Sequence, residues 1–94
     1  MDKCNVTDCD VYHAIKLIKP RYASVFIYSL NEGPKSFSTL KEEFDYINST
    51  QVVRTLNHLI KTNIVIKDDS NYKLTLYGQK LVPILDRLNE WYVK

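Results

Sequence analysis

The sequence predicts a mainly helical domain with one small β-hairpin, and three observations carry this prediction. Apolar residues recur at helical spacing in several separate segments. Only two glycines and three prolines interrupt the chain. Residues 64–67 and 72–76 are rich in β-branched or alternating apolar residues, and turn-forming residues 68–71 separate them.

The length of 94 residues predicts a single domain over residues 1–94, with residues 1–8 as a flexible tail. A hydrophobic content of 45% with 26% charged residues is typical of a globular chain. A domain of this size buries only about 60–70% of its unfolded surface, so its core is small. We therefore expect a partner subunit.

The N-terminal segment lacks the basic start and apolar stretch of a secretory signal, and no apolar run reaches the length of a membrane span. We expect a cytoplasmic protein that makes no membrane contact. In a reducing compartment a structural disulfide between Cys4 and Cys9 is not expected. Both cysteines are predicted to be free thiols.

Two helices are predicted in the N-terminal third of the chain. The first begins near Asp10, whose carboxylate suits a first turn, and ends before Pro20. Its apolar positions are Val11, Ala14, Ile15 and Ile18. The second begins at Arg21 and stops where Gly33 and Pro34 follow its last turn.

A third, short helix and a longer fourth helix follow. Phe37, Leu40 and Phe44 set the spacing of the third helix, which Ser36 or Ser38 caps. The fourth helix spans residues 48–62 and opens with Asn48 and Gln51 as a capping box. Two such helices followed by a hairpin predict a winged helix-turn-helix fold, with the hairpin as the wing.

The last segment predicts one helical stripe from Thr75 to the end, bent by Pro83. The domain can cover only part of this stripe. We therefore predict dimerisation through the N- and C-terminal helices, by an apolar surface of Tyr12, Leu85, Leu88, Trp91 and Tyr92.

The fourth helix has two unlike faces. Its predicted inward stripe is Val52, Leu56, Leu59 and Ile60, and its acid-free outward face is Ser49, Thr50, Val53, Arg54 and Asn57. Ser49 and Thr50 suit a phosphate contact, Arg54 and then Asn57 suit base edges, and Val53 suits a thymine methyl group. A polar stripe alone is more often a solvated surface, but the preceding helix, the capping box and the hairpin favour duplex DNA binding.

Charge adds weak support. The net charge is only +2, yet five cations stand between residues 35 and 67 against three acids. Lys35, Ser36 and Lys67 complete the predicted DNA-contacting set.

At this point the sequence resembles the HxlR-type regulators, a branch of the MarR-like winged-helix proteins. The resemblance begins at Cys9 and covers nearly the whole chain. The residues that carry it are Cys9, Asp10 and Val11, then Leu17, Ile18, Arg21 and Tyr22, then residues 33–37, 47–48 and 72–75 with Gly78, Pro83 and Trp91.

The resemblance implies a homodimeric transcription regulator, repressor or activator, that binds a pseudo-palindromic operator in double-stranded DNA. It also implies Cys9 as a sensor of oxidants or electrophiles. Three features depart from the family pattern: Lys19-Pro20 replaces Gly-Gly, Tyr22 replaces the Trp of the family's Lys-Trp pair, and the wing is short, with two acids at its tip. These acids would repel phosphate.

Alternatives remain for the cysteines and for the function. Cys9 is equally well explained as a small buried hydrophobic residue. Cys4, Cys9 and His13 are too few to predict a metal site. No catalytic motif is present, so we expect neither an enzyme nor a cofactor. The alternative function is a winged-helix protein-interaction module, which the low net charge and the acidic wing tip favour.

Overall fold

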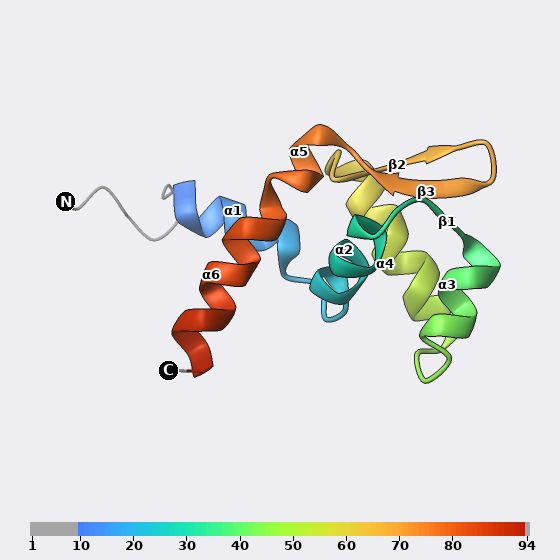
Figure 1. Ribbon diagram of the computed structural model, residues 1–94, viewed down its shortest axis with the longest axis horizontal. Helices are drawn as coiled ribbons and strands as arrows, with labels where there is room; N and C mark the ends of the chain where they lie inside the picture. Colours follow the sequence, from blue (N-terminus) through green and yellow to red (C-terminus); the bar gives the residue numbers. More distant parts are fainter. Residues whose placement is uncertain (1–9, 94) are drawn as a thin grey trace.

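Helices and a small three-stranded sheet make up residues 10–93, the part of the chain that this computed structural model describes (Figure 1). The helices α1 and α6 extend toward one end of the molecule, and α3 and the β2–β3 hairpin lie at the other. The elements are α1 (Asp10–Ile18), α2 (Ala23–Asn31), β1 (Lys35–Ser36), α3 (Phe37–Glu43), α4 (Ser49–Lys61), β2 (Val65–Asp68), β3 (Asn71–Leu74), α5 (Leu76–Gln79) and α6 (Leu81–Val93).

The first four helices form where the apolar spacing predicts them. At the end of α2, Gly33 adopts a positive φ of 147°, a conformation that glycine reaches without the steric cost of a Cβ atom. Ser36, rather than Ser38, caps α3 by accepting a hydrogen bond from the Thr39 backbone N–H at 3.2 Å. The predicted mainly helical fold with a small β element is confirmed.

The sheet has one more strand than predicted. Its strands are antiparallel in the order β1-β3-β2, so β3 lies in the centre. Lys35 and Lys67 flank Tyr72 from the two neighbouring strands. The two-residue strand β1 is too short to show any periodicity, and only its pairing with β3 defines it.

The C-terminal segment is divided, which corrects the prediction of one helix bent at Pro83. α5 ends at Gln79 and α6 begins at Leu81, so the break falls at Lys80. Pro83 stands in the first turn of α6, where a backbone N–H has no partner within the helix and its loss costs little. Within residues 10–93, no helix is long and apolar enough to cross a membrane.

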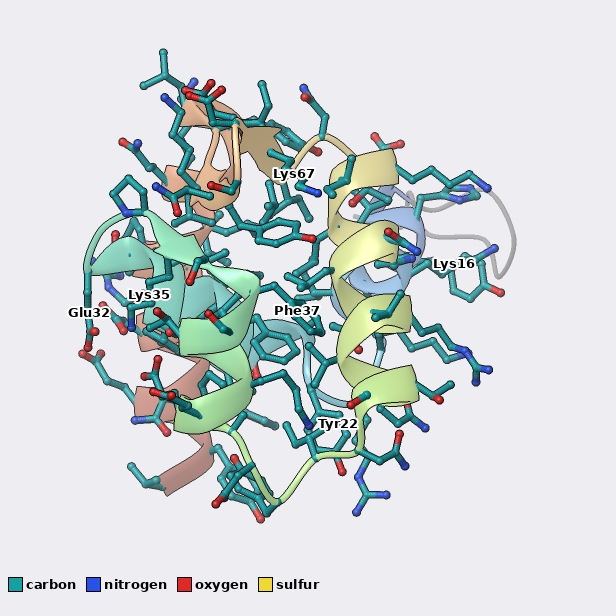
Figure 2. The ribbon with its side chains drawn as sticks, turned by 90° about the vertical axis from the view of Figure 1, so that its right-hand side faces the viewer. Lys16, Tyr22, Glu32, Lys35, Phe37 and Lys67 are labelled. Atoms are coloured by element: carbon teal, nitrogen blue, oxygen red, sulfur yellow. The ribbon has the colours of Figure 1, made fainter. Side chains whose placement is uncertain are left out.

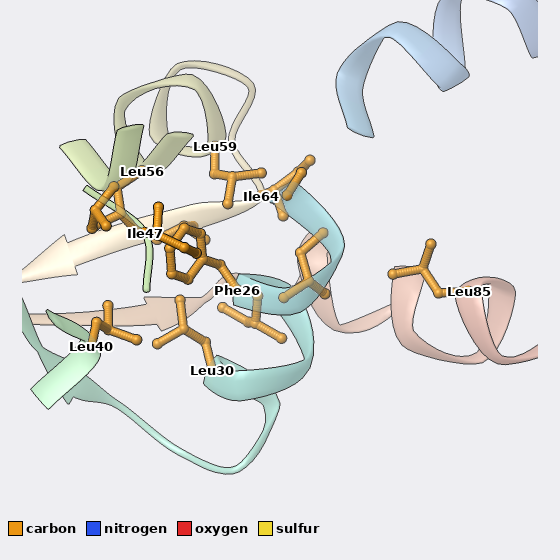
Figure 3. Packing of buried hydrophobic residues seen from close by; sticks show 13 residues of the cluster. Phe26, Leu30, Leu40, Ile47, Leu56, Leu59, Ile64 and Leu85 are labelled. Carbon is orange, nitrogen blue, oxygen red and sulfur yellow. The ribbon is translucent and has the colours of Figure 1, made fainter. Parts of the chain in front are cut away.

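The core lies between α2, α3, α4 and the sheet (Figure 3). Phe26 stands among buried aliphatic side chains and meets the ring of Phe44 edge-on, with 5.0 Å between ring centroids. Leu85 is also buried and extends the cluster onto α6, as Figure 3 shows. The fully buried members include Phe26, Leu40, Ile47, Val52, Leu56, Leu59 and Ile64.

Candidate nucleic-acid interface

The helix α4 is held in place by its N-cap and along one side. Asn48 is extended and accepts a hydrogen bond from the Gln51 backbone N–H at 2.9 Å, which is the Asn48 half of the predicted capping box. No acidic residue stands in the first turn of α4. The positive end of the helix dipole therefore remains uncompensated within the helix itself, which favours an anion there.

The buried side of α4 differs from the prediction by one residue. Val52, Leu56 and Leu59 enter the core as expected, whereas Ile60 is 36% exposed. Thr55 takes the fourth buried position. The buried stripe of α4 therefore contains Thr55 in place of Ile60.

The opposite side of α4 carries the five residues of the predicted outward face: Ser49, Thr50, Val53, Arg54 and Asn57. All five are exposed. Thr50, Val53, Arg54 and Asn57 line a shallow open hollow of about 390 Å³. The structure thus gathers a guanidinium, an amide, a hydroxyl and an aliphatic group on one surface of α4.

α3 and α4 lie side by side with Phe37 between them (Figure 2). The turn that joins them is fixed by Lys41, whose Nζ donates a hydrogen bond to the Ile47 carbonyl oxygen at 3.0 Å. Ser36 is half-buried, and its hydroxyl is engaged in the α3 cap. The two helices therefore present α4 in a fixed orientation.

Lys35, predicted to contact DNA, is instead held in a network within the domain. Its Nζ donates to Glu43 Oε1 at 2.8 Å, to Glu32 Oε1 at 2.9 Å and to Ser29 Oγ at 2.8 Å. Ser29 Oγ also donates to Glu43. Figure 2 shows Lys35 and Glu32 together on the side of the molecule away from α4. Two carboxylates neutralise this cation, so its placement does not support a phosphate contact.

The network shifts the pKa values of Lys35 and Glu43. The hydrogen bond from Lys35 lowers the pKa of Glu43; burial opposes that shift, and the bond from Ser29 assists it. Burial pulls the pKa of Lys35 down, but the hydrogen bonds to Glu43 and Glu32 outweigh it, so the net shift is upward. Both groups are therefore charged at neutral pH.

The wing is a tight hairpin whose tip is Asp69 and Ser70, with Asp69 at a φ of 60°. Asp68 is 3.7 Å from Lys73 Nζ, so one of the two acids has a cationic neighbour. Lys67 lies on β2 with its Nζ 5.6 Å from the centroid of the Tyr72 ring. Lys67 is exposed and remains a candidate for phosphate contact.

Sequence reasoning missed one cation near α4. Arg21, between α1 and α2, lines a second hollow together with Arg54. The sequence showed Arg21 as the start of a helix and as part of the family resemblance, but its approach to α4 depends on how the chain folds back. The available signal for this site was the basic residue Arg21 directly after Pro20, which ends the first helix.

Four of the five residues predicted for the dimer surface are exposed: Tyr12, Leu88, Trp91 and Tyr92. Leu85 is different, since only 6% of it is exposed and the chain's own core covers it. α1 buries none of its residues. The helices α1 and α6, which carry these residues, lie at the end of the molecule opposite α3 (Figure 1).

Cys4 and Cys9 lie outside the described residues, as does most of the Cys4–Cys9–His13 group considered as a metal site. Among residues 10–93, no three His, Cys, Asp or Glu side chains are grouped so that they could hold a metal ion.

The two-helix unit α3–α4, followed by the β2–β3 hairpin, defines a winged helix-turn-helix protein. A family model described as HxlR-like helix-turn-helix matches residues 17–94, and the chain belongs to this family. It is a transcriptional regulator with a helix-turn-helix DNA-binding fold, not an enzyme.

Individual relatives agree with this assignment. An uncharacterized HTH-type transcriptional regulator of Methanocaldococcus jannaschii is 31% identical, over 72% of this chain and 68% of the relative. Quinone-bound YodB from B. subtilis superposes with a TM-score of 0.82 at 26% identity, covering 87% of this chain and 93% of YodB. A putative MarR-family regulator from Porphyromonas gingivalis has the same fold, with a TM-score of 0.85 at 19% identity over 98% of this chain and 97% of that one.

Proposed function

We propose that this regulator binds duplex DNA sequence-specifically as a homodimer, with α4 in the major groove. The observation that carries the proposal is the exposed, acid-free outward face of α4, on which Arg54 and Asn57 stand together. An α-helix fits the major groove, where guanidinium and amide groups form bidentate hydrogen bonds with guanine and adenine.

Each residue of this face has a separate role in the proposal. Ser49 and Thr50, in the first turn of α4, contact a phosphate. Arg54 reads a base edge, with Asn57 one turn further along the helix, and Val53 contacts a thymine methyl group. Lys67 on the wing adds a phosphate contact, whereas Lys35 is left out because two carboxylates hold it.

The homodimer forms through α1 and α6. Tyr12, Trp91 and Tyr92 are exposed apolar side chains on these two helices, and a small domain that leaves such groups in water is expected to cover them. A two-fold axis would pair two α4 helices, which suits half-sites about 34–36 Å apart in a pseudo-palindromic operator.

The test of DNA recognition is Arg54→Ala, measured on duplexes selected from genomic fragments. We expect a loss of about 1–3 kcal/mol in specific binding, with no change in the thermal midpoint. Lys80→Ala is the charge-matched control, because Lys80 is exposed between α5 and α6. Equal binding by Arg54→Ala and the unmodified protein would refute the assignment of α4. If the unmodified protein bound no duplex even at low salt, a protein partner would be the better hypothesis.

Regulation through Cys9 is the second part of the proposal. Its support is the similarity to YodB, which is described in a quinone-bound form, together with a cysteine just before α1. The thiolate form of a cysteine is the nucleophile that attacks a quinone, and a helix N-terminus favours this anion. DNA binding by the unmodified protein is expected to respond to quinone, and binding by Cys9→Ser is expected not to respond. Cys4→Ser is the control, and an unchanged response in Cys9→Ser would refute the role.

A further inference from the structure

A hollow of about 260 Å³ lies between the α1–α2 turn and α4, next to the outward face of α4. We call it the turn hollow; it is lined by Pro20, Arg21, Gln51, Arg54, Thr55 and His58. The four α4 residues among these are spaced three and four apart, so they form a single stripe of the helix. Arg54 lines both this hollow and the shallow one on the outward face.

The side chains around the turn hollow are those that bind an oxyanion. Two guanidinium groups and one amide line it, and none of its lining residues is acidic. Among residues 10–93 the ion pairs are Lys35 with Glu32 and Glu43, and Lys73 with Asp68. Arg21 and Arg54 thus have no carboxylate partner within the described residues, in contrast to Lys35.

We infer that the turn hollow receives a backbone phosphate of the bound duplex and that Arg21 binds this phosphate, while Arg54 beside it keeps its base-reading role. The inference rests on the proposed function and adds a binding residue outside α4. Arg21 belongs to the turn before α2, so a major-groove α4 would leave it beside the sugar-phosphate backbone. Contacts from such flanking segments position a protein on DNA but do not read sequence.

Arg21 is prepared for this contact by its surroundings. Its guanidinium lies 5.4 Å from the centroid of the Tyr22 ring, and Tyr22 packs against the core. Figure 2 shows Tyr22 beside the N-terminal half of α4. The ring restricts the side chain, so Arg21 loses less conformational freedom on binding.

The two walls of the turn hollow are also fixed relative to each other. Pro20 has a restrained φ, and its carbonyl oxygen accepts the Ala23 backbone N–H at 3.0 Å, which closes the turn. On the other side, the His58 ring on α4 donates a hydrogen bond to the Leu17 carbonyl oxygen at 2.7 Å. The distance between the turn and α4 is therefore set before any ligand arrives.

The experiment compares Arg21→Ala with the unmodified protein on two labelled duplexes, one of random sequence and one selected from genomic fragments. Because a phosphate contact is independent of sequence, affinity should fall by the same factor on both duplexes. The slope of log K against log salt should become shallower by about 0.9 for the one lost contact. When the salt is raised from roughly 50 to 200 mM, the affinity of Arg21→Ala should therefore fall by a factor about threefold smaller than the affinity of the unmodified protein.

Two further variants make the result specific. Arg21→Lys keeps the charge and should retain most of the salt slope, and Arg87→Ala on α6 should leave the slope unchanged. An unchanged slope in Arg21→Ala, or a loss confined to the selected duplex, would overturn the inference while leaving the proposed function intact. If the unmodified protein bound neither duplex, the inference and the proposed function would both be refuted. Thermal unfolding of each variant checks that a loss of binding is not a loss of fold.

Discussion

The His58 ring on α4 donates a hydrogen bond from Nε2 to the Leu17 carbonyl oxygen, 2.7 Å away in the last turn of α1. The carbonyl groups of a helix's last turn have no partner within the helix, so the ring satisfies an acceptor that would otherwise require water. α1 buries none of its residues, and only its C-terminal end, at Leu17 and Ile18, packs against the core. This hydrogen bond therefore attaches α1 directly to α4.

Replacing the ring should loosen α1. We expect His58→Ala to lower the free energy of unfolding by about 1 kcal/mol and to speed hydrogen exchange of α1 amides. His13→Ala, which removes an exposed imidazole from α1, is the matched control. Unchanged exchange in α1 of the His58 variant would show that packing alone holds this helix.

The Lys35–Glu43 pair predicts how stability depends on pH. Since the folded pKa of Glu43 lies below 4.5, its contribution is complete above that pH and is lost as pH falls through the folded value. Since the folded pKa of Lys35 lies above 10.5, its contribution is complete below that pH and is lost as pH rises through the folded value. The network therefore stabilises the fold throughout the neutral range.

Glu43→Gln should flatten the acid limb of the plot of unfolding free energy against pH. Because 36% of the Glu43 side chain is exposed, the loss at neutral pH should stay under about 1 kcal/mol. The neighbouring Glu42→Gln is the control, as Glu42 is exposed. Denaturant unfolding at several pH values measures both, and equal acid limbs for the two variants would contradict the prediction.

Gly78 is required by a close approach of two backbones. It is buried in α5, and a methyl group at this position would overlap the carbonyl oxygen of Ile64. That oxygen already accepts hydrogen bonds from the Thr75 backbone and side chain. We expect Gly78→Ala to destabilise the domain by about 1–3 kcal/mol, against little change for the exposed Gln79→Ala. Thermal unfolding measures the stability of both variants, and a Gly78 variant as stable as the Gln79 variant would refute the packing argument.

The proposed dimer surface can be tested with a pair of matched leucines. Leu88 on α6 is 53% exposed and Leu76 on α5 is 77% exposed, so a new carboxylate at either position is tolerated by the monomer. Leu88→Asp should weaken self-association at least about tenfold, or about 1.4 kcal/mol, because the interface would bury the charge. Leu76→Asp should not. Sedimentation equilibrium measures both, and a Leu88 variant that associates as tightly as the unmodified protein would exclude α6 from the interface.

Most of the helical framework was predictable because its signals are local. Asn48 and Gln51 mark the start of α4 by type and spacing, and Gly33 marks the end of α2. The strand β1 could not be predicted, because two residues carry no periodicity and their partner, β3, lies far along the chain. The break at Lys80 was missed because the apolar stripe continues through it.

The candidate site was predicted only where one helix supplies it. The outward face of α4 follows from helical spacing, but Arg21 joins Arg54 only through the packing of the α1–α2 turn. Lys35 was predicted to contact DNA, because only the fold brings Glu43 of α3 to Lys35 beside Ser29 and Glu32 at the end of α2. Leu85 was placed on the dimer surface because no local pattern shows that α2 lies close enough to cover it.

Ser36 ends β1 and caps α3, so no linker residue separates the sheet from the helix-turn-helix unit. An inserted residue there would disturb both the β1–β3 pairing and the start of α3. The β2–β3 tip does not combine two structural roles in this way, since Asp69 and Ser70 are exposed and cap no helix. A peptide tag or fluorescent probe should therefore be accepted at the hairpin tip and rejected at Ser36.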